Sequence, residues 1–214
     1  MLRATPGLAR GRSNNALTPC RALTAREIAP AIARVCAFAS AHGVRPGIQV
    51  TPLGVHDDLD RVLDAHAWTH QPPTVVLAGA AGRRAATPAG LVVDDHAGAA
   101  WREAWARCEP GRDVEAHAAT VLAQLRGRAL FARIDYHAVG IAVPDGDLVG
   151  VFCVAVDPSR RRSGVATALV RALGHRSGAR RAYLQVEEDN SAARGLYARL
   201  GFAVSHRYEH RVAH

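Results

Sequence analysis

The sequence contains no lysine, although 27 basic residues give it a formal net charge of +8. Every one of those residues is therefore an arginine, and acidic residues are mixed with them along most of the chain. Aromatic residues make up only 5% of the sequence, so few flat side chains are available to stack on bases beside the arginines. We expect no nucleic-acid binding, but a basic surface still suits a ligand that carries phosphates.

Long apolar runs and paired cysteines are also missing. No window approaches the roughly 18 apolar residues of a membrane span, and no segment resembles the apolar core of a secretion signal. We therefore expect no membrane partner. The absence of a CxxC pair predicts a reduced, cytoplasmic setting rather than a disulfide framework. The cysteines are Cys20, Cys36, Cys108 and Cys153.

Histidine is common, with 11 residues, but its arrangement does not predict a metal site. His66 and His70 stand four residues apart, as do His206 and His210. No cysteine or carboxylate completes either pair into a tetrahedral ligand set. We therefore expect no bound metal.

Hydrophobic periodicity and turn residues divide the chain into four segments. Residues 1–24 are rich in Gly, Pro, Ser and Asn and are expected to form a disordered leader. Residues 25–78 alternate helical and strand patterns, residues 79–89 form a Gly- and Ala-rich linker, and residues 90–214 form a larger domain. The patterns predict helices at 25–42, 57–67, 97–108, 113–125, 164–175 and 191–200, and strands at 47–51, 74–78, 91–93, 129–134, 137–143, 148–156, 181–186 and 202–211.

The most informative stretch joins a buried strand to a helix through an arginine-rich turn. The strand 148–156 ends at Asp157-Pro158, and the helix begins at Gly164. Such a helix start presents unpaired backbone N–H groups and the positive end of the helix dipole, and both attract phosphate. Arg161 and Arg162 add fixed positive charge. No P-loop pattern is present, so the turn predicts a different kind of phosphate site.

Two sequence blocks resemble the GNAT family of N-acetyltransferases. Arg161-Arg-Ser-Gly-Val-Ala166 matches the family's pyrophosphate motif, [Q/R]-x-x-G-x-[G/A]. The segment 184–202, with Asn190 and the Leu-Tyr-x-x-x-Gly-Phe pattern that ends at Phe202, resembles the family's second block. The order of the two blocks is also that of the family.

The resemblance implies a fold and a co-substrate. The expected fold class is α/β (α+β): a GNAT fold whose mixed, mostly antiparallel central sheet is flanked by helices, preceded by a degenerate half-GNAT unit at 25–78. In GNAT enzymes the strand equivalent to 148–156 splays from its neighbour and binds the pantetheine arm of acetyl-CoA. The resemblance therefore implies that acetyl-CoA binds the following residues: Val154, Ala155, Val156, Arg161, Arg162, Ser163, Gly164, Val165, Ala166, Thr167, Asn190 and Tyr197.

The resemblance also implies catalytic roles. Tyr197 is expected to protonate the departing thiolate as a general acid. The general base is not identified by the sequence: some relatives carry a glutamate where Gln185 stands here, and glutamine cannot take a proton. Glu187 is the named candidate, and Asp135, His137 or a chain of waters are the alternatives.

An internal repeat suggests a tandem architecture. Ile48-Gln49-Val50 matches Leu184-Gln185-Val186, and each triplet lies between two predicted helices. Residues 25–78 thus resemble a degenerate copy of 164–211. The chain is similar to an actinobacterial tandem-GNAT group that includes unconventional N-acetylglutamate synthases, and to mycothiol synthase.

Several functions remain open at this point. The first is an acetyl-CoA-dependent N-acetyltransferase for a small-molecule amine, for example an amino acid such as glutamate. The alternatives are a transferase for protein N-termini or lysines, a mycothiol-synthase-like enzyme, and a non-catalytic acyl-CoA sensor. The expected assembly is a monomer or homodimer.

Overall fold

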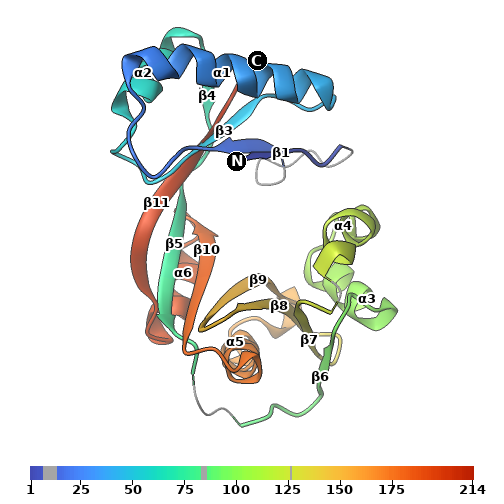
Figure 1. Ribbon diagram of the computed structural model, residues 1–214. Helices are drawn as coiled ribbons and strands as arrows, with labels where there is room; N and C mark the ends of the chain where they lie inside the picture. Colours follow the sequence, from blue (N-terminus) through green and yellow to red (C-terminus); the bar gives the residue numbers. More distant parts are fainter. Residues whose placement is uncertain (7–13, 83–85, 126) are drawn as a thin grey trace. The chain divides into compact units, whose positions relative to one another are not determined.

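The computed structural model describes residues 1–6, 14–82, 86–125 and 127–214. Figure 1 shows its helices and strands, most of them labelled. The helices are α1 (Ala25–Ala41), α2 (Asp57–Ala65), α3 (Ala99–Cys108), α4 (Val114–Thr120), α5 (Val165–Ser177) and α6 (Ser191–Arg199), with 3₁₀ turns at Leu122–Leu125 and Pro158–Arg160. The strands are β1 (Leu2–Arg3), β2 (Asn15–Leu17), β3 (Gly47–Val50), β4 (Thr69–His70), β5 (Thr74–Ala80), β6 (Leu91–Asp94), β7 (Leu130–Ile134), β8 (Ala138–Asp145), β9 (Leu148–Val156), β10 (Arg181–Glu187) and β11 (Ala203–Val212).

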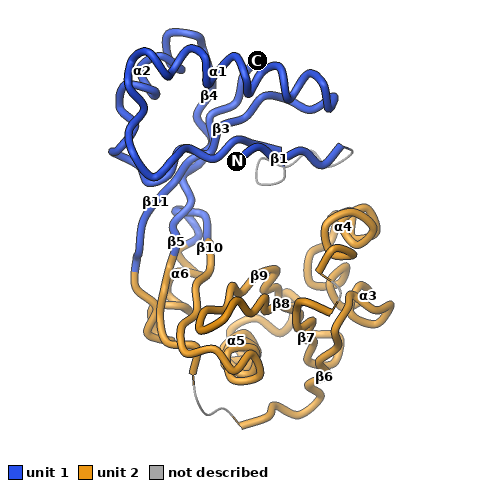
Figure 2. The backbone as a smooth tube through the Cα atoms, viewed as in Figure 1, with its two compact units in different colours: residues 1–76, 186–190, 204–214 blue, residues 77–185, 191–203 orange. Residues whose placement is uncertain are grey.

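The chain forms two compact units, coloured separately in Figure 2. Unit 1 comprises Met1–Val76, Val186–Asn190 and Val204–His214, and unit 2 comprises Leu77–Gln185 and Ser191–Ala203. The sequence predicts a continuous division instead, with 25–78 before 90–214. The structure differs because β5, β10 and β11 each contribute residues to both units.

Unit 2 contains the mixed, mostly antiparallel sheet that the sequence predicts. Strands β6, β7, β8 and β9 pair antiparallel in that order, and β10 pairs parallel to β9. The hairpin between β8 and β9 turns at Gly146-Asp147, because Asp145 lies opposite Leu148. Gly146 supplies the positive φ of +57° that such two-residue turns require.

Helices cover both faces of the unit 2 sheet. Val139 packs in a core cluster with Trp101 and Trp105 of α3, which are 1% and 2% exposed. The next residue, Gly140, points the other way, since a side chain there would contact Leu169 and Leu173 of α5. Neighbouring strand residues point to opposite faces, so α3 and α5 cover opposite sides of the sheet. The two tryptophans are core residues.

Unit 1 is built around a second group of paired strands. β1 pairs antiparallel with β2, β2 runs parallel to β3, and β3 pairs antiparallel with the C-terminal strand β11. The prediction of an unstructured leader is therefore wrong for β1 and β2, because backbone pairing with β3 orders a segment whose composition favours loops. Residues 7–13 of that leader and 83–85 of the predicted linker lie outside the described residues.

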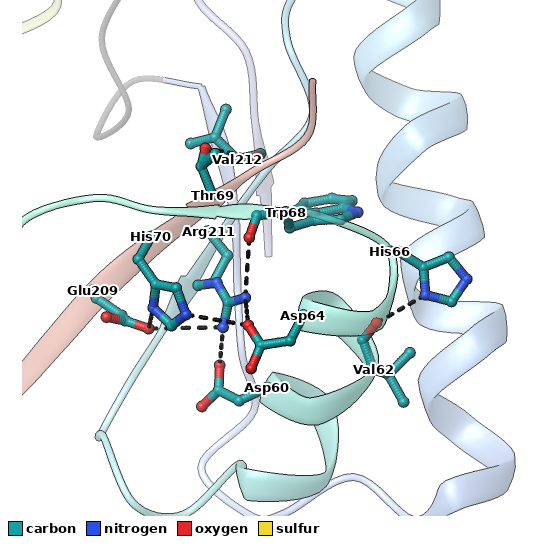
Figure 3. Close-up of polar contacts among 10 residues, drawn as sticks. All are labelled: Asp60, Val62, Asp64, His66, Trp68, Thr69, His70, Glu209, Arg211 and Val212. Carbon is teal, nitrogen blue, oxygen red and sulfur yellow. Dashed lines mark hydrogen bonds and ion pairs between the residues drawn. The ribbon is translucent and has the colours of Figure 1, made fainter.

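The last strand is fixed within unit 1 by a buried arginine, shown in Figure 3. The Arg211 side chain is 0% exposed, and its guanidinium bonds Asp60 Oδ1 at 2.9 Å, the Asp64 carboxylate and the Trp68 carbonyl oxygen at 3.1 Å. His70 completes the arrangement through a hydrogen bond to Asp64 at 3.1 Å. A buried charge is tolerated only when it is paired and hydrogen-bonded in this way.

Within the described ranges, no helix is long and apolar enough to cross a membrane.

Candidate functional site

Strand β9 is interrupted by a β-bulge in its second half. Val139 lies opposite Ala155, while Ile141 lies opposite Phe152. One residue of β8 therefore faces two residues of β9, Cys153 and Val154. Cys153 adopts a positive φ of +51°, which is uncommon for a residue with a side chain. A bulge of this kind bends the strand and redirects its edge, and bulges are frequent beside active sites.

The pairing between β9 and β10 stops where the bulge begins. Their parallel register runs from Leu148 opposite Arg181 to Val151 opposite Leu184, although β9 continues to Val156. At the end of β9, the Asp157 N–H donates to the His137 carbonyl oxygen at 2.8 Å and so points towards β8. The alternation of an extended strand then turns the N–H groups of Val154 and Val156 away from β8. This edge can pair with an extended ligand as a neighbouring strand would.

The turn after β9 is held by its own polar groups. Asp157 Oδ1 accepts hydrogen bonds from the Ser159 N–H at 2.9 Å and from its hydroxyl at 2.7 Å. These bonds hold the pKa of the Asp157 carboxyl below its usual value. The chain then passes through Arg162, at a φ of +64°, and Gly164, at +83°. An added Cβ at Gly164 would meet no protein atom within 4 Å, so its positive φ is the structural reason for glycine.

The first turn of α5 offers backbone donors to a ligand. Its first intrahelical bond runs from the Ala168 N–H to the Gly164 carbonyl oxygen at 3.0 Å. The N–H groups of Val165, Ala166 and Thr167 precede that bond and have no acceptor within the helix. Exposed arginines at 160, 161 and 162 stand immediately before them. Donors, helix dipole and guanidinium groups together fit a phosphate-bearing ligand.

Tyr197 lies on α6 in unit 2 and is 7% exposed. Its ring packs edge-on against Phe202, with ring centroids 6.0 Å apart. Burial raises the pKa of its hydroxyl to about 12. The hydroxyl is therefore protonated at neutral pH and can donate a hydrogen bond.

The structure assigns the predicted site residues to different units. Residues 154–167 form one continuous segment of unit 2, which also contains Tyr197, whereas Glu187 and Asn190 belong to unit 1. The Asn190 N–H donates to the Glu187 carbonyl oxygen at 3.0 Å. Glu187 itself is exposed.

The other two candidate bases lie at the turn between β7 and β8. The Asp135 N–H donates to the Gly90 carbonyl oxygen, and His137 Nδ1 is 3.8 Å from Asp157 Oδ2. His137 therefore stands beside the start of the arginine-rich turn. The bulge, by contrast, lies opposite Gly140. At this location His137 is better placed to influence the arginine-rich turn than to accept a proton from an amine beside the bulge.

Sequence reasoning missed an aromatic pair beside the end of the β9–β10 ladder. Phe152 and Tyr183 make an edge-to-face contact, with ring centroids 5.8 Å apart and planes at 84°. Both rings lie over Gly150, where an added Cβ would be 2.5 Å from the Phe152 ring. The available signal was a glycine inside a strand, which often marks a close approach.

No set of three histidine, cysteine, aspartate or glutamate side chains in the described part of the chain could hold a metal ion.

Solved structures with the same fold include several acetyltransferases. The GCN5-related N-acetyltransferase from Kribbella flavida has a TM-score of 0.66 and 19% identity, over 94% of this chain and 81% of that one. The corresponding enzyme from Sphaerobacter thermophilus has a TM-score of 0.57 and 20% identity, over 78% and 59%. A tandem GNAT protein from the clavulanic acid biosynthesis pathway has a TM-score of 0.57 and 15% identity, over 83% and 66%. The chain spans less than two thirds of the last two proteins.

These structural likenesses show the fold. No curated protein matches the chain. A protein family, however, matches residues 1–211, nearly the whole sequence, and is described as "Probable histone acetyltransferase Rv0428c C-terminal". The chain therefore belongs to the Rv0428c C-terminal family and has the fold of GNAT acetyltransferases.

Proposed function

We propose that this chain is an acetyl-CoA-dependent N-acetyltransferase that transfers an acetyl group to the amine of a small molecule. The observation that carries the proposal is the end of the β9–β10 ladder at Val151, followed by a bulge and an arginine-rich turn into α5. This arrangement supports binding of a long ligand with amides at one end and phosphates at the other.

Acetyl-CoA has those chemical features. The backbone of Val154 and Val156 pairs with the amides of the pantetheine arm, and the N–H groups of 164–167 bind the pyrophosphate with Arg161 and Arg162. Each hydrogen bond contributes about 0.5–1.5 kcal/mol net, and more when the acceptor is charged. Several such bonds give a Kd on the order of micromolar.

When bound, acetyl-CoA supplies the acetyl group as a thioester. The chain's own groups orient that ester and assist the departure of sulfur. The N–H groups on the β9 edge polarise the thioester carbonyl. Tyr197 donates a hydrogen bond to the sulfur and gives up its proton as negative charge develops there.

The pKa of Tyr197 limits that step. A hydroxyl with a pKa of about 12 is a weaker acid than an ordinary thiol, whose pKa is about 8.5. Full proton transfer is therefore uphill by about 5 kcal/mol unless the bound ligand lowers the pKa. Tyr197 accordingly acts first as a hydrogen-bond donor and only late as an acid.

The motif match adds two residues to the proposal. Asn190 contacts the pantetheine arm, and the proton of the amine leaves through Glu187 or through a chain of waters. These roles come from the motif match. The Glu187→Gln variant tests the second route: slower transfer to alkyl amines at unchanged acetyl-CoA affinity supports Glu187, and unchanged transfer supports water.

Thiol release from acetyl-CoA in the presence of an amine panel tests the function. The panel contains amino acids, including glutamate, together with alkyl amines and aryl amines. Amine-dependent release of coenzyme A supports the proposal. Tight acetyl-CoA binding with no release for any amine contradicts it and favours an acyl-CoA sensor.

Transfer to protein lysines is the second candidate, because the matching family carries a histone acetyltransferase description. A lysine-containing histone peptide, compared with the same peptide carrying arginine at each lysine, distinguishes the two. Faster transfer to the lysine peptide than to every small amine favours the second candidate.

A further inference from the structure

The acceptor amine must approach β9 from the side of α3. Gly164 leads directly into α5, and Leu169 and Leu173 of α5 cover one face of the sheet around Gly140. The phosphate site and the helix together occupy that face. The opposite face, next to the bulge, is the one from which an amine can reach a thioester held along β9.

Phe152 and Tyr183 lie on that opposite face. Gly150 stands across from Val143, which packs against the cluster under α3. Residues directly opposite each other in a ladder point to the same side, so Gly150 faces α3 as well. Phe152 packs against the same cluster, and the Tyr183 hydroxyl lies over Gly150.

The two rings form a platform at the end of the ladder. They meet above Gly150, where an added Cβ would be 2.5 Å from the Phe152 ring and 2.8 Å from the Tyr183 hydroxyl. Phe152 follows Val151, the last β9 residue that pairs with β10. Both rings are half-buried, so each retains exposed area. An edge-to-face pair of this kind favours a further ring as its neighbour.

Neither ring of this platform takes up a proton at neutral pH, and the Asp145 carboxylate near Tyr183 lies at the hairpin end of β8, away from the bulge. Gln185 follows Tyr183 on the same face of β10, since strand residues two apart share a face. A glutamine does not take a proton, and burial, with the Asp145 carboxylate, raises the pKa of Tyr183. An alkyl ammonium at pH 7 is neutral in only about one molecule in 10³, so it requires a base. An amine attached directly to an aromatic ring is already neutral at that pH.

We propose that the acceptor is an amine carried on an aromatic ring, and that Phe152 and Tyr183 bind this ring. The proposal rests on the proposed acetyltransferase function. The amine nitrogen forms a bond to the acetyl carbon while the carbon–sulfur bond breaks, and the electron pair of the broken bond stays on sulfur. The amine loses one N–H proton, and a proton neutralises the thiolate, which gives an N-aryl acetamide and free coenzyme A. Neither ring carries a charge that could bind a carboxylate, so acidic acceptors such as glutamate are disfavoured.

Rates for three amines test this proposal in the wild-type protein: 4-methylaniline, benzylamine and β-alanine. We expect the highest kcat/KM at pH 7 for 4-methylaniline, by about tenfold or more: β-alanine lacks a ring, whose burial contributes at least that factor, and benzylamine is mostly protonated. Its rate should be nearly constant from about pH 6 to 9, whereas the benzylamine rate should rise up to about tenfold per pH unit. A preference for β-alanine, benzylamine or a lysine peptide overturns this inference and leaves the proposed function intact. Acetyl-CoA binding without thiol release for any amine overturns both.

Variants locate the ring-binding site. Phe152→Leu should lower kcat/KM for 4-methylaniline about tenfold and leave the Kd for acetyl-CoA within about twofold. Phe38→Leu, on α1 of unit 1, is the matched control and should change neither quantity. If Phe152→Leu does not fold, Tyr183→Phe serves instead: it keeps a ring and should retain the preference for 4-methylaniline. An equal loss for all three amines in Phe152→Leu, or loss of the preference in Tyr183→Phe, contradicts the assignment.

Discussion

Replacing Gly164 by alanine separates the backbone role of this residue from its role in ligand binding. Gly164 has a φ of +83°, and an added Cβ would meet no protein atom within 4 Å. The substitution should therefore cost only the conformational penalty of a left-handed residue, roughly 1–2 kcal/mol. For a chain of this size, that penalty lowers Tm by about 2–8 °C. The protein should remain folded.

Gly164→Ala should weaken acetyl-CoA binding more than its small effect on stability suggests. The new methyl group would enter the open space beside the first turn of α5, where we expect it to displace a bound phosphate. Loss of one hydrogen bond to a charged acceptor costs about 1.5–3 kcal/mol. The Kd for acetyl-CoA should therefore rise by about tenfold or more.

Gly178 provides the matched control. It ends the same helix at a φ of +69°, and an added Cβ there also meets nothing within 4 Å. Gly178→Ala should show a similar fall in Tm and an unchanged Kd. Calorimetric titration of both variants with acetyl-CoA checks the comparison. Equal affinity in Gly164→Ala and Gly178→Ala would refute the assignment of the phosphate site.

Three further predictions concern other parts of the chain. Tyr197→Phe should lower kcat by about 10²-fold with unchanged acetyl-CoA affinity in calorimetry, and full activity would exclude its proton-donor role. Gly174→Ala should destabilise unit 2 by about 1–3 kcal/mol in urea unfolding, because its Cβ would overlap the Ala81 carbonyl oxygen; an unchanged midpoint would mean that α5 is not held there. Arg211→Met should destabilise unit 1 and flatten its acid transition, because the Arg211 guanidinium lowers the pKa of the Asp64 carboxyl from 3.8. The ion pair stabilises the folded state above that value, and the stabilisation is lost as pH falls through the lower, folded-state pKa. An unaltered acid transition would contradict the pairing.

Local features of the fold could be predicted from the sequence. Strand β9 and helix α5 agree closely with expectation, because an apolar run, Asp157-Pro158 and Gly164 fix their ends through local backbone preferences. The core positions of Trp101 and Trp105 follow from their spacing on one helix face. In each case the relevant interactions involve residues near one another in the chain.

Features that depend on distant partners could not be predicted. Strand β11 pairs with β3, and Arg211 near its end is buried by carboxylates of α2, although the sequence pattern of β11 gives only a strand. Ordering of β2 likewise depends on pairing with β3. The bulge at Cys153 has no local signal, since neither glycine nor asparagine marks the positive φ.

The candidate site was predicted in part. The motif around Gly164 indicated the turn between β9 and α5 as a candidate phosphate site, and the structure adds the positive φ of that glycine and the end of the ladder beside Val151. The platform of Phe152 and Tyr183 was missed, because two strands bring it together over Gly150. Acceptor recognition is thus a tertiary property that a motif does not encode.

Amide hydrogen exchange with and without acetyl-CoA tests the central claim most directly, because it reports on the backbone groups themselves. We predict slower exchange at residues 154–156 and 164–167 when acetyl-CoA is present, and unchanged exchange in α1 of unit 1. Protection confined to unit 1, or no protection at a saturating concentration of acetyl-CoA, would contradict it.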